Sequence, residues 1–303
     1  MKSAWSAALS LSVAVTVSAV VLVASAGMAS AQTSSAPAAT GSSPKEPRLD
    51  KRAIALMRRS AQFLAGQGKM SFNWFVSYDE VIEGREKLTF MRSGTNLLVR
   101  DQGFYSRAEG ENGIREWHYD GKQVTFAAPA ENYYASDEFT QGFDALVDSA
   151  RENIGSEIPL YAIMRRGLPE RLEEGLKGAA YLGITRVAGQ EVHHLAFADE
   201  EEDWQVWLST DEQQPVPVVI IGTEPKKIGW PQYRAYLMDW NFKPEYDAAQ
   251  FTYSPGDGAV KITFPDLKAK AAGGVQGEAG KAEAAAGSND ADASSKTIEG
   301  QQK

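Results

Sequence analysis

Apolar and polar residues alternate over one central stretch of the chain, and this pattern predicts a β-hairpin. Two apolar runs, 192–198 and 204–208, flank a turn of five acidic residues. In the second run Trp204 and Val206 share one face, and Trp207 lies on the other. Both faces therefore carry large apolar groups. Helices, a second layer of sheet or an apolar ligand could cover them.

Further runs of alternating or wholly apolar residues predict most of a sheet. They cover residues 70–78, 88–92, 96–100, 103–108, 114–119, 123–127, 179–187, 216–222 and 232–240, with a final pair over 251–253 and 260–264. Short turns such as Asn112-Gly113 and Asp120-Gly121 separate several of them. Because parallel neighbours need a long crossover connection, strands joined in this way form an antiparallel meander.

Four other segments have the 3.6-residue period of amphipathic helices. They cover residues 50–64, 139–154, the stretch from 158 to 165, and 169–176. Asp50 is a suitable N-cap for the first, and Pro169 suits the first turn of the last. An amphipathic helix needs an apolar surface, and the predicted sheet is the only one available.

The two ends of the chain differ in composition from the middle. Residues 1–31 have a basic start, an apolar centre and the small-residue pattern Ala29-Ser30-Ala31, which together predict a cleaved signal peptide rather than a transmembrane anchor. Residues 32–47 predict a disordered linker, and 267–303 a disordered tail rich in Ala, Gly and Ser. The remaining residues, 48–266, form one predicted domain. Export predicts a periplasmic or secreted protein.

Charge and cysteine content exclude several classes of function. Without the signal peptide the chain has 30 basic and 40 acidic residues, a net charge of −10, which disfavours nucleic-acid binding. The chain contains no cysteine, so it has no disulfide framework, thiol nucleophile or thiolate metal site. No phosphate-binding glycine motif is present, and we predict no cofactor.

The three histidines do not predict a metal or catalytic site. His193 and His194 are adjacent on one strand and point to opposite faces, so they cannot share an ion, and His118 lies on a different strand. No serine occurs in a nucleophile-elbow motif. Acidic pairs are common but fall in turns and at helix ends, where solvated acids are the norm. We therefore predict no catalytic residue, although a hydrolase with isolated acids in a cleft stays open.

Several short motifs together resemble a known family, over about residues 50–264. They include Tyr119-Asp-Gly-Lys122, Tyr181-Leu-Gly183, His193-His-Leu-Ala-Phe197, Asp203-Trp-Gln-Val-Trp207, Pro231-Gln-Tyr233 and Asp239-Trp-Asn241. As a set they resemble the predicted periplasmic proteins grouped as domain of unknown function 2092, which in turn resemble carriers of bacterial outer-membrane lipoproteins, the LolA-like fold. The resemblance implies a mainly β fold with a strongly curved antiparallel sheet or incomplete barrel, and helices covering its concave side.

The predicted strands are unusually rich in aromatic residues, and two interpretations of this are open. Most of these residues are ordinary core. A subset could line a cavity between sheet and helices, and for this we select Phe72, Trp74, Val76, Phe90, Phe197, Trp204 and Val206. The leading hypothesis is a non-enzymatic binding or carrier protein for a lipid or for lipoprotein acyl chains. A structural or partner-binding module with a filled core is the alternative.

Overall fold

The computed structural model describes residues 49–111, 113–150, 158–173 and 175–265. The predicted signal peptide, linker and tail lie outside these residues, as does part of the helix predicted over 139–154. Among the described helices, none is long and apolar enough to cross a bilayer.

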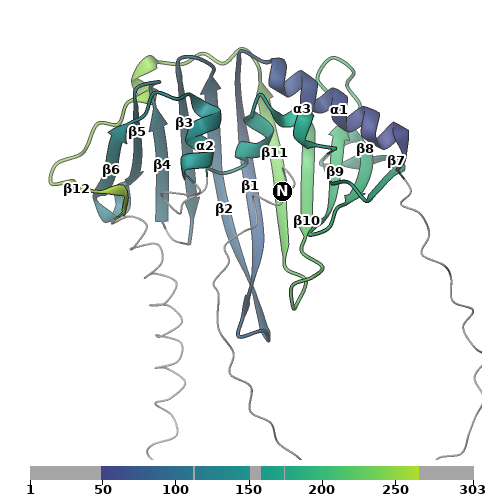
Figure 1. Ribbon diagram of the computed structural model, residues 1–303. Coiled ribbons are helices and arrows are strands. Elements are labelled where there is room, and N and C mark those ends of the chain that lie inside the picture. Colours follow the sequence, from purple (N-terminus) through teal and green to yellow (C-terminus); the bar gives the residue numbers. More distant parts are fainter. Residues whose placement is uncertain (1–48, 112, 151–157, 174, 266–303) are drawn as a thin grey trace, which may run out of the picture.

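The described residues form one curved sheet of twelve strands (Figure 1). In chain order these are β1 (Lys69–Ile82), β2 (Glu86–Val99), β3 (Gly103–Gly110), β4 (Gly113–Tyr119), β5 (Gln123–Ala128), β6 (Tyr133–Glu138), β7 (Gly178–Val187), β8 (Gln190–Ala198), β9 (Asp203–Ser209), β10 (Pro217–Thr223), β11 (Gln232–Asn241) and β12 (Val260–Ile262). Their order in the sheet is β12-β6-β5-β4-β3-β2-β1-β11-β10-β9-β8-β7.

The sheet is an open one, with β12 and β7 at its two ends. Two antiparallel meanders, β1 to β6 and β7 to β11, meet where β1 pairs with β11. All neighbouring strands are antiparallel except β12, which pairs with β6 in parallel. The predicted curved, unclosed and mainly antiparallel sheet is therefore confirmed.

Helices lie on one face of this sheet (Figure 1). They are α1 (Lys51–Gly66), α2 (Phe143–Ser149), η4 (Tyr161–Met164) and α3 (Leu168–Arg171). The carboxylate of Asp50 caps α1 by accepting hydrogen bonds from the backbone N–H groups of Arg52 and Ala53, at 2.8 and 3.3 Å. The backbone N–H of Asp50 donates to the carbonyl of Ala179 at 3.0 Å, so the start of α1 is fixed to edge strand β7.

The main hydrophobic core lies between these helices and the sheet. It joins the apolar stripe of α1 to the buried faces of strands from both meanders, and it includes α2, η4 and α3. On α1 the stripe is formed by Ala53, Met57, Ala61 and Leu64. Because these residues recur every three or four positions, they lie on a single face of the helix.

On the opposite face of the sheet, the described residues form two small apolar clusters. In one, Phe251 packs against Leu97 and Val99. In the other, Trp207 packs beside Val192 and its neighbours on β10. The predicted apolar groups on both faces are thus present, but on this face side chains and one short segment cover them instead of a second layer.

One strand is longer than its sequence pattern predicted. Two strands were expected over 88–92 and 96–100, but β2 runs through both without a break. A Cβ atom at Gly94 would lie against the carbonyl oxygen of Arg107 and 2.5 Å from the indole ring of Trp74. Gly94 is therefore needed where the strand passes close to a buried ring, and it does not mark a turn.

The last part of the domain differs from the prediction. Residues 251–253 are not a strand, because Phe251 ends the short helix η5 (Ala248–Phe251), which Asp247 and Gln250 cap. Strand β12 pairs instead with β6, which was not predicted as a strand. This pairing links segments more than a hundred residues apart, which local alternation cannot reveal.

Candidate functional site

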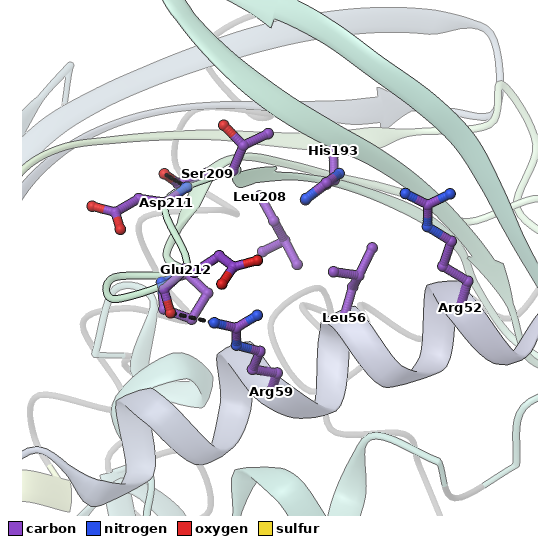
Figure 2. A pocket seen from close by; sticks show the side chains of 10 residues that line it. Arg52, Leu56, Arg59, His193, Leu208, Ser209, Asp211 and Glu212 are labelled. Carbon is purple, nitrogen blue, oxygen red and sulfur yellow. Dashed lines mark hydrogen bonds between the residues drawn. The ribbon is translucent and has the colours of Figure 1, made fainter.

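A hollow lies between α1 and the open end of the β8–β9 hairpin, opposite its turn (Figure 2). Its volume is about 190 Å³. The lining residues come from α1, from β8 and β9, and from the loop that follows β9: Arg52, Leu56, Arg59, His193, Leu208, Ser209, Thr210, Asp211, Glu212 and Pro215. We call this the α1 pocket.

Helix geometry brings three residues of α1 to the pocket. Arg52, Leu56 and Arg59 are four and three positions apart, so they share one side of the helix beside its buried stripe. Figure 2 shows all three side chains directed from the helix toward the strands. Leu56 packs against the main core, and Leu208 on the opposite wall is part of that core. The pocket therefore has an apolar floor.

Charged groups occupy the rim. The guanidinium of Arg52 stacks over the ring of Tyr181 at 4.0 Å, and that of Arg59 donates to the backbone carbonyl of Glu212. Among the described residues neither guanidinium forms an ion pair with a carboxylate. Asp211 and Glu212 are exposed on the opposing loop. The rim thus has a cationic side on the helix and an anionic side on the loop.

The surroundings of His193 in this pocket favour its neutral form. Burial lowers its pKa below the ordinary value, and the positive charges of Arg52 and Arg59 lower it further. Its Nδ1 lies 3.1 Å from the hydroxyl of Tyr181. The neutral ring leaves the two arginines as the cationic groups of the pocket.

The other histidines are occupied by structural partners. Nε2 of His194 lies 2.9 Å from Oε1 of Gln205, and its ring stacks on Trp207 on the outer face of the sheet. Nδ1 of His118 lies 2.8 Å from the carbonyl oxygen of Gln250. The prediction that His193 and His194 point to opposite faces is confirmed. No cluster of potential metal ligands occurs in the part of the chain that the structure describes.

The predicted lining residues lie deeper than the α1 pocket. Phe72, Trp74, Val76, Phe197, Trp204 and Val206 are buried in the main core, beneath the helices. Phe90 is half-buried, stacks on Tyr78 and lies outside that core. None of the seven lines the α1 pocket, although Leu208 follows Val206 on the same face of β9. Contact with a ligand stays a prediction for these residues.

Sequence reasoning missed the residues of the α1 pocket. The available signal was the spacing of Arg52, Leu56 and Arg59 along one side of a helix whose buried stripe was predicted correctly. The loop 209–215 gave no such signal, because only its position in the fold places it opposite α1.

Comparison with known proteins assigns this architecture to a family. An open, curved sheet with helices on one face defines the structural class, and a family model described as "Predicted periplasmic protein" matches residues 53–265. The chain belongs to this family, domain of unknown function 2092, and the resemblance of its motifs is confirmed. No protein of curated function matches the sequence.

Several solved structures resemble the fold at low sequence identity. Lipoprotein LppX of Mycobacterium tuberculosis is 11% identical, with a TM-score of 0.40, over 65% of this chain and 100% of that one. LprF of Mycobacterium bovis is 10% identical, with a TM-score of 0.39, over 71% and 100% of the two chains. A LolA superfamily protein of Nitrosomonas europaea is 10% identical, with a TM-score of 0.31, over 66% and 97%. Similarity at this level does not define a ligand.

Proposed function

We propose that this protein is a non-enzymatic, periplasmic binding protein for a lipid-like ligand. The observation that carries the proposal is the α1 pocket, which joins a charged rim to an apolar floor continuous with the main core. A ligand that fits both parts has a polar head and an apolar chain. The chain would follow Leu56 and Leu208 inward, between α1 and the sheet.

The charges of the rim favour one kind of head group. Arg52 and Arg59 would bind a phosphate, because guanidinium groups donate pairs of hydrogen bonds to phosphate oxygens. Asp211 and Glu212, on the opposing loop, would attract an ammonium group. A zwitterionic phospholipid head carries both charges. A fatty-acid carboxylate would use only the arginines.

The binding energy of such a ligand would come mainly from its chain. Each buried methylene contributes about 0.8 kcal/mol, so ten of them contribute on the order of 8 kcal/mol before the costs of association. That is enough for a carrier without catalytic groups.

Native mass spectrometry of the full chain, purified from a bacterial periplasm, tests the proposal. We expect a co-purifying phospholipid, and protection against heat by added phosphatidylethanolamine. The double variant Arg52→Gln/Arg59→Gln should weaken both effects, because the head group loses its cationic partners. Arg58→Gln is the matched control, because Arg58 lies on the same helix but pairs with Glu173 on the side of α3.

The result that would overturn the proposal is absence of any bound lipid together with absence of thermal protection by phospholipids and by fatty acids. Equal losses in the control and in the double variant would also contradict a role for the α1 pocket. Loss of fatty-acid binding alone in the double variant, with phospholipid binding kept, would place a carboxylate at the two arginines instead of the zwitterionic head.

A structural or partner-binding module is the second candidate, and one observation favours it. Rings predicted to line a cavity pack against other rings: Phe197 stacks on Trp204, also a predicted lining residue, with 4.0 Å between ring centroids, and the ring centroids of Phe72 and Trp240 are 4.4 Å apart. Such contacts are typical of a filled core. A hydrophobic fluorescent dye distinguishes this module from a lipid-binding protein, because a filled core leaves the dye in solution.

A further inference from the structure

Two hairpins extend beyond the rest of the sheet (Figure 1). One is β1–β2, which turns at residues 83–85, and the other is β10–β11, whose connection runs from residue 224 to 231. They are neighbours, because β1 pairs with β11. Both tips point away from the side where α1 crosses the strands (Figure 1).

Both tips expose large apolar side chains. Ile228 is 72% exposed and Trp230 is 67% exposed, while Ile82 and Leu88 on the neighbouring hairpin are also exposed. A Cβ atom at Gly84 would lie 3.8 Å from Cδ1 of Ile228, so the tips are in close proximity. We call these four apolar residues the tip cluster.

A buried carboxylate fixes the tips relative to each other. The side chain of Asp79 on β1 is 1% exposed and accepts hydrogen bonds from both terminal nitrogens of Arg234 on β11, each at 3.2 Å. It also accepts from the backbone N–H of Gln232 at 3.1 Å and from the hydroxyl of Thr89 at 2.9 Å. Lys87 donates to the carbonyl of Gly229 at 3.3 Å.

The backbone at the tip is held in an uncommon conformation. Trp230 has a φ of +48°, in the left-handed region that non-glycine residues rarely adopt. Such a conformation persists where the surrounding contacts fix it. Together with the contacts of Asp79, it keeps the tip cluster ordered before any partner binds, which lowers the entropy cost of binding.

Charges of both signs surround the tip cluster, and several of them form ion pairs. Arg85 lies 3.6 Å from Glu86, Lys226 lies 3.0 Å from Glu201, and Lys227 lies 2.6 Å from Glu224. Lys87 lies 3.6 Å from Asp79. No excess of basic residues therefore surrounds the apolar groups, and the chain as a whole carries a net charge of −9. An anionic surface is a poor match for this arrangement.

We propose that the tip cluster docks on the surface of a zwitterionic lipid bilayer, with Trp230 and Ile228 entering the interface. The indole group is favoured at this depth, because its ring is apolar and its N–H remains near the polar head groups. A projecting, convex and locally neutral tip suits a soft bilayer surface. The proposal is independent of the lipid in the α1 pocket.

Flotation of the full chain with phosphatidylcholine vesicles tests this docking. We expect binding that varies little with salt and does not increase when phosphatidylglycerol is added. The variant Ile228→Ser/Trp230→Ser should bind more weakly by about tenfold or more, because it removes two large apolar groups from the contact. The control is Leu182→Ser/Ile184→Ser, which changes two similarly exposed residues of edge strand β7.

Several outcomes would overturn the proposal. They are no vesicle binding by the unmodified chain, equal losses in both variants, or binding that needs phosphatidylglycerol and disappears in salt.

If sedimentation shows a dimer that only the tip variant disrupts, the tip cluster binds a second copy instead of a bilayer. Lipid bound to each purified variant is measured in parallel. The tip variant should retain its bound lipid. Failure of the docking proposal can therefore be distinguished from failure of the proposed lipid-binding function.

Discussion

Trp74 donates a hydrogen bond from its indole Nε1 to Oδ1 of Asn96, at 3.3 Å, in the middle of the hydrophobic core. The side chain of Asn96 is fully buried. Its Oδ1 also accepts a hydrogen bond from the hydroxyl of Ser106 at 2.7 Å, and its Nδ2 donates to the carbonyl of Pro159 at 2.8 Å. Asn96 thus joins three adjacent strands to the segment that leads into η4.

Replacing Asn96 with Ala should lower the free energy of unfolding by about 2–4 kcal/mol, because it leaves buried polar groups of Trp74, Ser106 and Pro159 without this partner. Chemical denaturation measures the change. Asn73→Ala is the control: its side chain is exposed and donates to Asp239, so we expect a loss below about 1 kcal/mol. Similar losses of unfolding free energy in the two variants would mean that the buried hydrogen-bond network contributes little to stability.

Local patterns were enough to predict most elements of the fold. The hairpin around the acidic turn, the capped start of α1 at Asp50 and the amphipathic stripe of that helix all follow from neighbouring residues. The break expected near Gly94 and the strand expected over 251–253 were wrong. In both places a long-range contact, with Trp74 or with Gly103, decides the local structure.

The candidate site was less predictable for the same reason. Arg59 meets the carbonyl of Glu212, 153 positions later in the chain, and no period in the sequence links them. The buried aromatic residues were identified by their strand positions. Whether they surround a ligand depends on packing between helices and sheet, which is not a local property.

Replacing Trp204 with Ala tests how full the core is. Trp204 stacks on Phe197, and its removal should cost about 3–5 kcal/mol of unfolding free energy and leave a cavity. In a filled core the variant should take up a hydrophobic dye that the unmodified protein leaves in solution. Trp207→Ala, on the outer face, is the control and should not increase dye uptake. Strong uptake by the unmodified protein would instead show that space exists already.

A partly buried ion pair ties α2 to the segment after η4. Arg165, whose side chain is 9% exposed, donates to both carboxylate oxygens of Asp148, at 2.9 and 2.7 Å. A double-mutant cycle with Arg165→Met and Asp148→Asn should give a coupling energy of about 1–3 kcal/mol.

The neighbouring pair Arg166 and Asp101 is the control for that cycle. Both side chains are largely exposed, at 59% and 88%, and the closest N–O distance is 3.2 Å. Solvent screening should keep its coupling below about 1 kcal/mol. Equal coupling energies for the two pairs would contradict the role of burial.

Glu202 should make stability fall as pH rises. Its side chain is buried in the β8–β9 turn, and Oε2 has no hydrogen-bond partner among the described residues. Burial raises the pKa of Glu202 to about 8, with the negative charge of Asp199 adding to the shift. The unfolded chain has the ordinary value near 4.5. Between pH 4.5 and pH 8 the folded state keeps a proton on Glu202 that the unfolded state has lost. The stability that this group contributes is therefore fully present below pH 4.5 and is lost as pH rises toward 8.

Glu202→Gln removes this titration and should stabilise the protein at pH 8 by up to about 4 kcal/mol, with little difference at pH 4.5. Denaturation at a series of pH values measures the effect for both proteins. Glu201→Gln is the control, since that exposed carboxylate pairs with Lys226 and should change stability by less than about 1 kcal/mol at any pH. A stability difference between Glu202→Gln and the unmodified protein that stays constant with pH would mean that Glu202 is ionised in the folded state, because only a shifted pKa makes the difference depend on pH.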